Sequence, residues 1–249
     1  MKTLILFFLL ILSFYSYGQN TNPDVDIHWE VDVTSIDLFS ECRDDVQNNF
    51  SSFMKETGFG EVKPGQSLTM YWTKIAGTGA LQSASASITG PSAKLAYQIQ
   101  RKQLNPGKLI QLKNTQLVEF ENFAKKNITN TSIIQVLIKD ILEGDNSNRC
   151  YYIVFSDLVE NSNIVNCYKS IPFTRIQIKT VVDKIDPYLK ANLKQKLDRG
   201  FMPRLILVQK ETNGKVDSQK IREFWLNLLH NLGIDNVQII DNLTNKINR

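Results

Sequence analysis

The sequence predicts an α/β fold, a doubly wound and mostly parallel open sheet in three layers, with helices on both faces. Segments of strand and helix periodicity alternate along most of the 249 residues. The segment 150–155 is apolar at every position, as expected of a central strand that helices cover on both sides. A chain of this length can bury one full core, so we expect a single domain over 27–249.

The first 18 residues are typical of a cleaved export signal. Lys2 gives a positive start, nine apolar residues follow over 4–12, and Ser16 and Gly18 are small residues that suit a signal peptidase. We expect cleavage before Gln19, because a transmembrane helix needs about 20 apolar residues. No cysteine follows the apolar run for lipid attachment. The sequence therefore predicts a secreted or periplasmic protein without stable membrane insertion.

A polar leader over 19–26 precedes the first predicted strand, 27–33, in which apolar residues alternate with polar ones. A helix with one apolar face follows. Ser35 or Asp37 can cap its start, and Gly58 ends it.

A second strand is predicted over 67–73. The next passage, 77–93, is rich in Gly, Ser and Ala and alternates weakly, which indicates a hairpin or a long loop insertion. Two helices are expected over 115–126 and 131–143, before the apolar strand 150–155.

The rest of the chain repeats the alternation. Helical periodicity runs over 176–197, and 205–208 is a second buried strand. A further amphipathic helix over 218–232 ends at Gly233, and a last short strand spans 237–240. Parallel pairing through right-handed crossovers follows from this order.

The charge and the cysteines exclude several classes of site. The 29 basic residues include Lys2, so 28 remain against 25 acidic residues after signal removal, a net charge of +3 without long runs. This balance argues against nucleic acid as a partner. In an oxidising compartment two of Cys42, Cys150 and Cys167 can pair, or all three are small core residues. No CxxC occurs and the two histidines are far apart, which argues against zinc.

Two predicted strands end on a carboxylate next to hydroxyl side chains. Asp32 is followed by Thr34, and Asp157 is preceded by Ser156. In doubly wound sheets ligands bind at the carboxyl ends of the strands, where neighbouring strand ends meet. Oxygen ligands without nitrogen or sulfur suit Mg²⁺, Ca²⁺ or Mn²⁺.

At these residues the chain resembles the von Willebrand factor A family, whose metal-ion-dependent adhesion site combines a D-x-S/T-x-S motif, a later threonine and a later aspartate. Asp32 and Thr34 match the opening motif. Thr131 begins a segment similar to the T-x-I-x-x-A-L helix start of the family, and Asp157 is similar to its strand-end aspartate. The resemblance implies a metal site made of Asp32, Thr34, Thr131 and Asp157, with Ser35 and Ser156 in support, and Mg²⁺ or else Ca²⁺ or Mn²⁺ as the ion.

The motif departs from the family at one position, because Ile36 stands where a hydroxyl is expected. A water, Ser35 or Asp37 would then have to serve the metal instead. Residues 157–162 resemble a variant found in uncharacterised bacterial members, and Phe224-Trp225 followed by Gly233 fits it too.

Each predicted ligand also has a purely structural interpretation. Asp32 and Asp157 can cap the helices that follow their strands, and Thr131 can be an ordinary N-cap. His28 is expected to be a satisfied histidine on a sheet face.

The resemblance implies a binding protein in which an acidic side chain of a protein partner completes the metal shell. A bacterial source is inferred from residues 16–19, which resemble the cleavage pattern of exported Bacteroidetes proteins. One alternative is a metal-free interaction scaffold that uses another surface, such as 77–93. A second is a metal-dependent hydrolase or phosphatase using Asp32, although such enzymes need an aspartate where Thr34 stands. No serine elbow or phosphate-binding glycine loop occurs, so we predict no catalytic residues.

Overall fold

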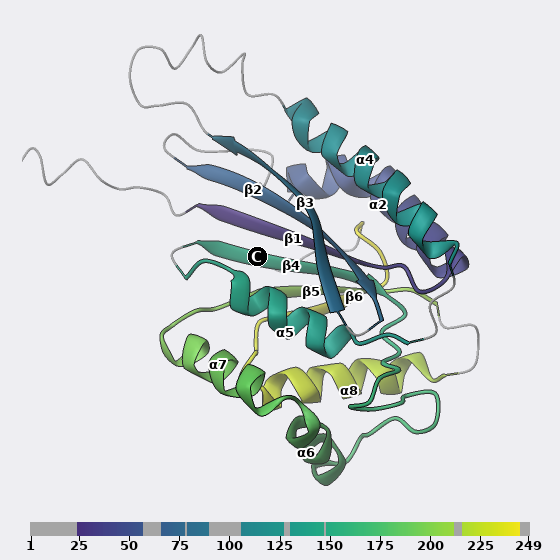
Figure 1. The fold of residues 1–249 in the computed structure, drawn as a ribbon, viewed down its shortest axis with the longest axis vertical. Helices are drawn as coiled ribbons and strands as arrows, with labels where there is room; N and C mark the ends of the chain where they lie inside the picture. The colour runs from purple at the N-terminus through teal and green to yellow at the C-terminus, as the bar shows by residue number, and fades with distance from the viewer. Residues whose placement is uncertain are drawn as a thin grey trace, which may run out of the picture.

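The computed structural model describes residues 24–56, 66–77, 79–89, 106–126, 130–146, 148–211 and 216–244. Within them one sheet has the strand order β3-β2-β1-β4-β5-β6. Helices cover both of its faces (Figure 1). The predicted signal, most of the leader and the end of the 77–93 passage lie outside the described residues.

All neighbouring strands pair in parallel except β2 and β3, which are antiparallel. The strands are β1 (Val25–Asp32), β2 (Ser67–Ala76), β3 (Gly79–Thr89), β4 (Arg149–Ser156), β5 (Arg204–Gln209) and β6 (Val237–Ile240). This confirms an α/β fold with a mostly parallel sheet. It also makes the described part of the 77–93 passage a hairpin with β2, because β3 returns at once along its neighbour.

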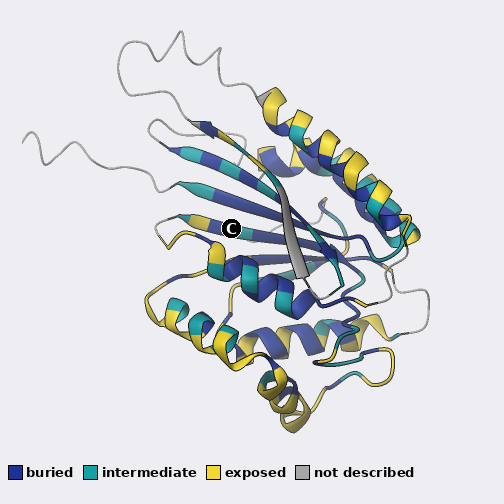
Figure 2. Cartoon of the chain, viewed as in Figure 1, coloured by how far each residue is buried: buried dark blue, intermediate teal, exposed yellow. Residues whose placement is uncertain are grey.

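The helices form two outer layers. They are α2 (Ile36–Glu56), α4 (Pro106–Ala124), α5 (Ile133–Glu143), α6 (Arg175–Lys184), α7 (Pro187–Asp198) and α8 (Ser218–Asn231). The α2 and α4 helices share one apolar core with the sheet, and the other four share a second core on the opposite face (Figure 1). Figure 2 shows the sheet buried between them, while the outer surfaces of α4, α6 and α7 are exposed.

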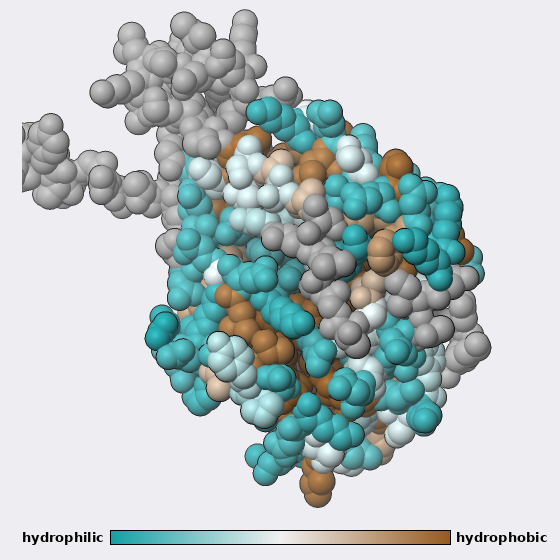
Figure 3. Space-filling model, in the orientation of Figure 1, coloured by the Kyte–Doolittle hydropathy of each residue, from teal (hydrophilic) through white to brown (hydrophobic). Residues whose placement is uncertain are grey.

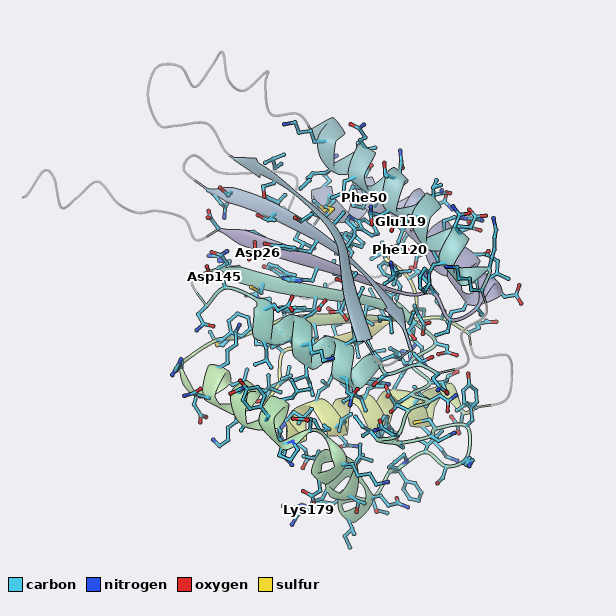
Figure 4. All side chains as sticks on the ribbon, in the orientation of Figure 1. Asp26, Phe50, Glu119, Phe120, Asp145 and Lys179 are labelled. Atoms are coloured by element: carbon cyan, nitrogen blue, oxygen red, sulfur yellow. The ribbon has the colours of Figure 1, made fainter. Side chains whose placement is uncertain are left out.

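The first core is built around Trp29 in the middle of β1. Its ring stacks on Trp72 of β2 at 5.3 Å and lies parallel to Phe155 of β4 at 5.8 Å between ring centroids. Phe50 of α2 and Phe120 of α4 extend this cluster, and both point toward the sheet in Figure 4. The aromatic side chains therefore hold the three central strands together from one side.

The opposite face of β1 is polar and buried, which the sequence did not predict. This strand begins at Val25, so Asp26 belongs to β1 and not to the predicted leader over 19–26. Asp26, His28 and Glu30 are all at least nine-tenths buried. His28 stacks between two tyrosine rings, and burial lowers its pKa to about 3. The prediction of a satisfied histidine is wrong for its Nε2, which has no hydrogen-bond partner among the described residues.

Two helix predictions are corrected. The single helix expected over 176–197 is two helices, α6 and α7, because Pro187 cannot supply the backbone N–H that a continuous helix requires. Asp186 caps α7 by accepting hydrogen bonds from the backbone N–H groups of residues 188 and 189. The helix expected from residue 115 begins at Pro106, a favoured first position of a helix.

All three cysteines are buried and unpaired, as in the alternative of three small core residues. Burial raises the pKa of Cys150 and of Cys167 to about 12, so their reactive thiolates are scarce in the folded protein. We expect a thiol reagent to label no cysteine rapidly in the native protein and all three after denaturation without reductant. Labelling of only one cysteine in denaturant would indicate a disulfide instead.

None of the helices in the described ranges is long and apolar enough to cross a membrane.

Candidate functional site

Asp32 and Ser156 are the last residues of the neighbouring strands β1 and β4, and their side chains meet. The strands pair in parallel up to Val31 and Phe155, which brings the next residue of each to the same edge. The Ser156 hydroxyl donates to Asp32 Oδ2 at 2.8 Å, and neither residue is exposed. The prediction that these two strand ends meet at one edge of the sheet is confirmed.

The second oxygen of Asp32 binds Thr34. Asp32 Oδ1 accepts hydrogen bonds from the Thr34 backbone N–H at 2.9 Å and from its hydroxyl at 2.6 Å. Asp32 therefore does not cap α2. That role belongs to Ser35, whose hydroxyl accepts from Leu38 N at 3.2 Å. Ser35 is thus engaged with the helix, as one of its two predicted roles required.

Asp157 follows β4 and forms a tight turn with its neighbours. Its Oδ1 accepts from Val159 N at 2.9 Å and lies 3.5 Å from the Ser156 hydroxyl, which itself accepts from Leu158 N at 3.0 Å. Ser156 therefore contacts both carboxylates. No helix begins within this turn, so Asp157 is not a helix cap either.

The turn at Leu158 is strained. Leu158 has a φ of 61°, a left-handed conformation that is rare for a bulky side chain. It is fully buried, and its carbonyl accepts a hydrogen bond from Trp225 Nε1 at 2.8 Å. Such strain costs about 1–3 kcal/mol, persists only where surrounding contacts enforce it, and clusters at functional sites. The α8 helix therefore fixes the backbone beside Asp157.

This contact gives a direct stability prediction. Replacing Trp225 with phenylalanine keeps an aromatic ring but leaves the buried Leu158 carbonyl without its donor. We expect a loss of about 1–3 kcal/mol in the free energy of unfolding, measured by urea titration. Replacing exposed Leu226 with alanine in the same helix should change stability by less than about 0.5 kcal/mol. An unchanged Trp225→Phe protein would contradict this role.

Thr131 lies beside the same edge, held by its backbone. Its N–H donates to the Asn161 carbonyl at 3.1 Å, and Asn161 returns a hydrogen bond at 3.0 Å. Ser132 N donates to the Gly77 carbonyl at 3.1 Å, directly after β2. The structure thus places Thr131 between the end of β2 and the loop after Asp157. No hydrogen bond joins its hydroxyl to either carboxylate, and the N-cap of α5 is Ser132 and not Thr131.

Two residues that the sequence did not single out belong to this environment. Glu160 is fully buried, and its Oε2 accepts from Ile134 N at 3.1 Å, so it caps α5 from the loop after β4. Burial raises its pKa to about 7, and the Asp32 charge adds to the shift. Tyr168 is half-exposed, and burial together with Asp157 and Asp32 raises the pKa of its phenol. The positions of Glu160 and Tyr168 depend on the path of the loop between β4 and α6, which the periodicity of the sequence does not reveal.

The two predicted carboxylates have no positive partner among the described residues, and Asp32 is fully buried while Asp157 is partly buried. Burial raises the pKa of Asp32, against hydrogen bonds from Thr34 and Ser156 that lower it. Burial raises the pKa of Asp157 to about 7, with a further contribution from the Asp32 charge. No Lys, Arg or His of the described ranges forms an ion pair with either. Buried Asp45, in contrast, is paired with Lys210.

The donor set fits a hard divalent cation, because it consists of carboxylate and hydroxyl oxygens around an uncompensated negative charge. Among the described residues, no three or more His, Cys, Asp or Glu side chains are grouped so that they could hold a metal ion. The predicted site contains two such side chains, Asp32 and Asp157, and depends on hydroxyls for its other ligands.

No protein-family model matches the chain, and no curated protein is similar to it in sequence. Two crystal structures of the pilus adhesin SpaC from Lactobacillus rhamnosus GG are similar, with TM-scores of 0.43 and 0.42 and identities of 11% and 12%. The second of these is an open conformation. Each match covers 91% of this chain, which spans 29% of the adhesin. Structural similarity at these TM-scores carries no functional argument, so any inference about function depends on the residues at the strand ends.

Proposed function

We propose that the chain is a von Willebrand factor A-like binding protein whose Asp32–Asp157 site holds a divalent cation and, through it, an acidic group of a protein partner. The observation that supports this most is the Ser156 hydroxyl, which contacts fully buried Asp32 and partly buried Asp157, and neither carboxylate forms an ion pair with a basic side chain of the described residues. The ligands are Asp32, Thr34, Thr131 and Asp157, with Ser156 in support and Mg²⁺ as the first candidate ion, ahead of Mn²⁺ and Ca²⁺.

Electrostatics supports a cation at this position. Two carboxylates at one edge of the sheet repel each other, and burial makes their ionised forms costly. A bound cation removes both penalties and supplies a positive centre that a partner carboxylate can reach. The chain itself contributes a rigid frame, because β1, β4 and the Trp225 hydrogen bond fix the backbone around the site. Preorganisation of this kind favours binding.

The metal-free scaffold remains a second candidate because Asp32 is already well satisfied. Its two oxygens accept three hydrogen bonds, from Thr34 and Ser156, without any ion. On this candidate the polar strand ends only stabilise the turn, and the partner binds elsewhere.

Calorimetric titration with Mn²⁺ and Mg²⁺ tests the proposal. We expect heat of binding and, with cation about 100-fold above its Kd, a rise in Tm of about 5–10 °C, since such binding stabilises by about 2.7 kcal/mol. Asp32→Ala should abolish both effects, whereas Asp44→Ala on the exposed face of α2 should retain them.

The same titration separates the candidates. If the wild-type protein and Asp32→Ala both give no heat and no shift in Tm, the cation site is refuted and the scaffold stands. A hydrolase would instead turn over a generic phosphate ester in a manner that Asp32→Asn abolishes.

A further inference from the structure

The net charge of the α6–α7 region is more positive than that of the whole protein. Residues 169–204 contain nine basic and three acidic side chains, a net charge of +6. The whole chain has a net charge of +4, so the rest of it sums to −2. The region belongs to the second helix layer, and its α6 helix lies at the lower end of the molecule in Figure 1.

Most of these basic side chains form no ion pair with a residue that the structure describes. Within the region, Lys190 pairs with Asp183 at 4.0 Å and Lys194 with Asp198 at 2.8 Å. Arg175 and Lys179 of α6 are exposed and form no ion pair with any residue that the structure describes. Figure 4 shows Lys179 at the outer end of α6, pointing away from the body of the molecule.

Large apolar side chains project from the same region. Phe173 is 63% exposed, Ile176 80%, Tyr188 74% and Met202 80%. Figure 3 shows hydrophobic atoms standing out at the lower end of the molecule among hydrophilic ones, where Figure 1 places α6. An exposed apolar patch that polar residues surround marks a surface that contacts a membrane or another molecule.

The start of α6 holds these apolar groups in a fixed position. Thr174 and Gln177 form a reciprocal capping box, and the Gln177 side chain also accepts from Phe173 N at 3.2 Å. Ile178 of the same helix is buried in the core, while Ile176 faces outward. The helix is therefore anchored on one side and presents Phe173 and Ile176, flanked by Arg175 and Lys179, on the other.

We propose that this α6 tip, defined as Phe173, Arg175, Ile176 and Lys179, docks the protein on an anionic lipid membrane. Basic side chains are attracted to anionic headgroups, and apolar side chains beside them enter the boundary between headgroups and acyl chains. A lipid surface fits better than an acidic protein because the apolar groups protrude from a convex end, whereas protein partners are usually met by complementary packed surfaces. The tip is separate from the Asp32–Asp157 site and does not depend on it.

Co-sedimentation with vesicles tests the tip. The protein is expected to bind vesicles of phosphatidylglycerol and phosphatidylcholine, and not vesicles of phosphatidylcholine alone. Arg175→Glu with Lys179→Glu should weaken binding on the order of 30-fold or more, because each basic residue near an anionic surface contributes strongly. Phe173→Ser with Ile176→Ser should weaken it about tenfold or more, through lost apolar contact.

A matched control lies on the opposite face of the sheet. Ile110 and Val118 of α4 are 40% and 63% exposed, and changing both to serine should leave vesicle binding unchanged. All of these positions are exposed, so we expect the Tm of each variant to be unchanged. An unchanged Tm confirms that the variant folds. Absence of binding to anionic vesicles would overturn the proposal. Equal binding of wild type and the Phe173→Ser, Ile176→Ser variant to anionic vesicles would also overturn it. Binding would then depend on charge alone, and charge alone would attract an acidic protein equally well.

Discussion

The cation-free protein is expected to lose several kcal/mol of unfolding free energy as the pH rises from about 4 to about 7. Burial raises the pKa of Asp140, Asp157 and Glu160 to about 7 in the folded protein, from ordinary values of 3.8, 3.8 and 4.5. The folded state therefore keeps protons that the unfolded chain releases. Its stability is greatest below the unfolded pKa values and declines until the folded groups have ionised, at about 1.4 kcal/mol per unit of pKa.

His28 has the opposite effect. Burial lowers its pKa from 6.5 to about 3, so its contribution to stability increases as the pH rises across that interval. One histidine does not offset three carboxyl groups, and the net slope remains negative. Urea unfolding at pH values between about 4 and 8, in the presence of a chelator, measures this slope.

A divalent cation should flatten the decline, because it favours the ionised form of Asp157. Asp157→Asn should make the slope shallower without cation and remove the response to cation. Exposed Asp44→Asn should change neither. A stability that rises with pH throughout this interval, in the presence of chelator, would contradict the assignment of buried protonated carboxyl groups.

Replacing Trp29 with alanine is expected to destabilise the protein by about 3–5 kcal/mol. The ring is fully buried and lies between Trp72 and Phe155, with Phe53 edge-on at 5.5 Å. Its removal leaves a cavity where β1, β2, β4 and α2 meet, so hydrophobic burial and aromatic contacts are lost together. The free energy of unfolding from urea titration measures this effect.

Trp29→Phe is the graded control and should lose less, because a smaller ring still fills part of the space. Val118→Ala on the exposed face of α4 should stay within about 0.5 kcal/mol of wild type. A loss below about 1 kcal/mol in Trp29→Ala would show that the central strands do not depend on this stack.

Most of the fold follows from local patterns in the sequence. The strand at 150–155 is apolar throughout, and it does lie inside the sheet between two helix layers. The strand at 237–240 coincides with β6. The periodicity of apolar residues does not reveal the end of a helix when the next helix continues the same pattern. The pattern over 176–197 holds through Pro187, but the ring ends one helix and begins the next.

The buried polar face of β1 was not predictable from alternation. His28 and Glu30 alternate with apolar residues as solvent-facing positions would, yet α5 covers that face and brings Asp140 toward Glu30. Both Glu30 oxygens and Asp140 Oδ2 lack hydrogen-bond partners in the described part of the chain. Only the tertiary position of α5 decides that these side chains are inside.

The candidate site could be predicted in part. Asp32 and Ser156 end adjacent apolar strands, and parallel pairing brings such ends together. Thr34 lies beside Asp32 because a residue two positions on can hydrogen-bond back to an aspartate. Glu160 and Leu158 could not be predicted, because their roles depend on Trp225 and α5, which are distant in sequence.

Diffraction from crystals grown with Mn²⁺ tests the cation site most directly, because the anomalous signal of the ion locates it without reference to the protein atoms. We expect a peak about 2–2.6 Å from side-chain oxygens of both Asp32 and Asp157, and none in crystals of Asp32→Ala. The absence of a peak at the ends of β1 and β4 would contradict the proposed cation site, whether or not the crystals hold ordered Mn²⁺ elsewhere.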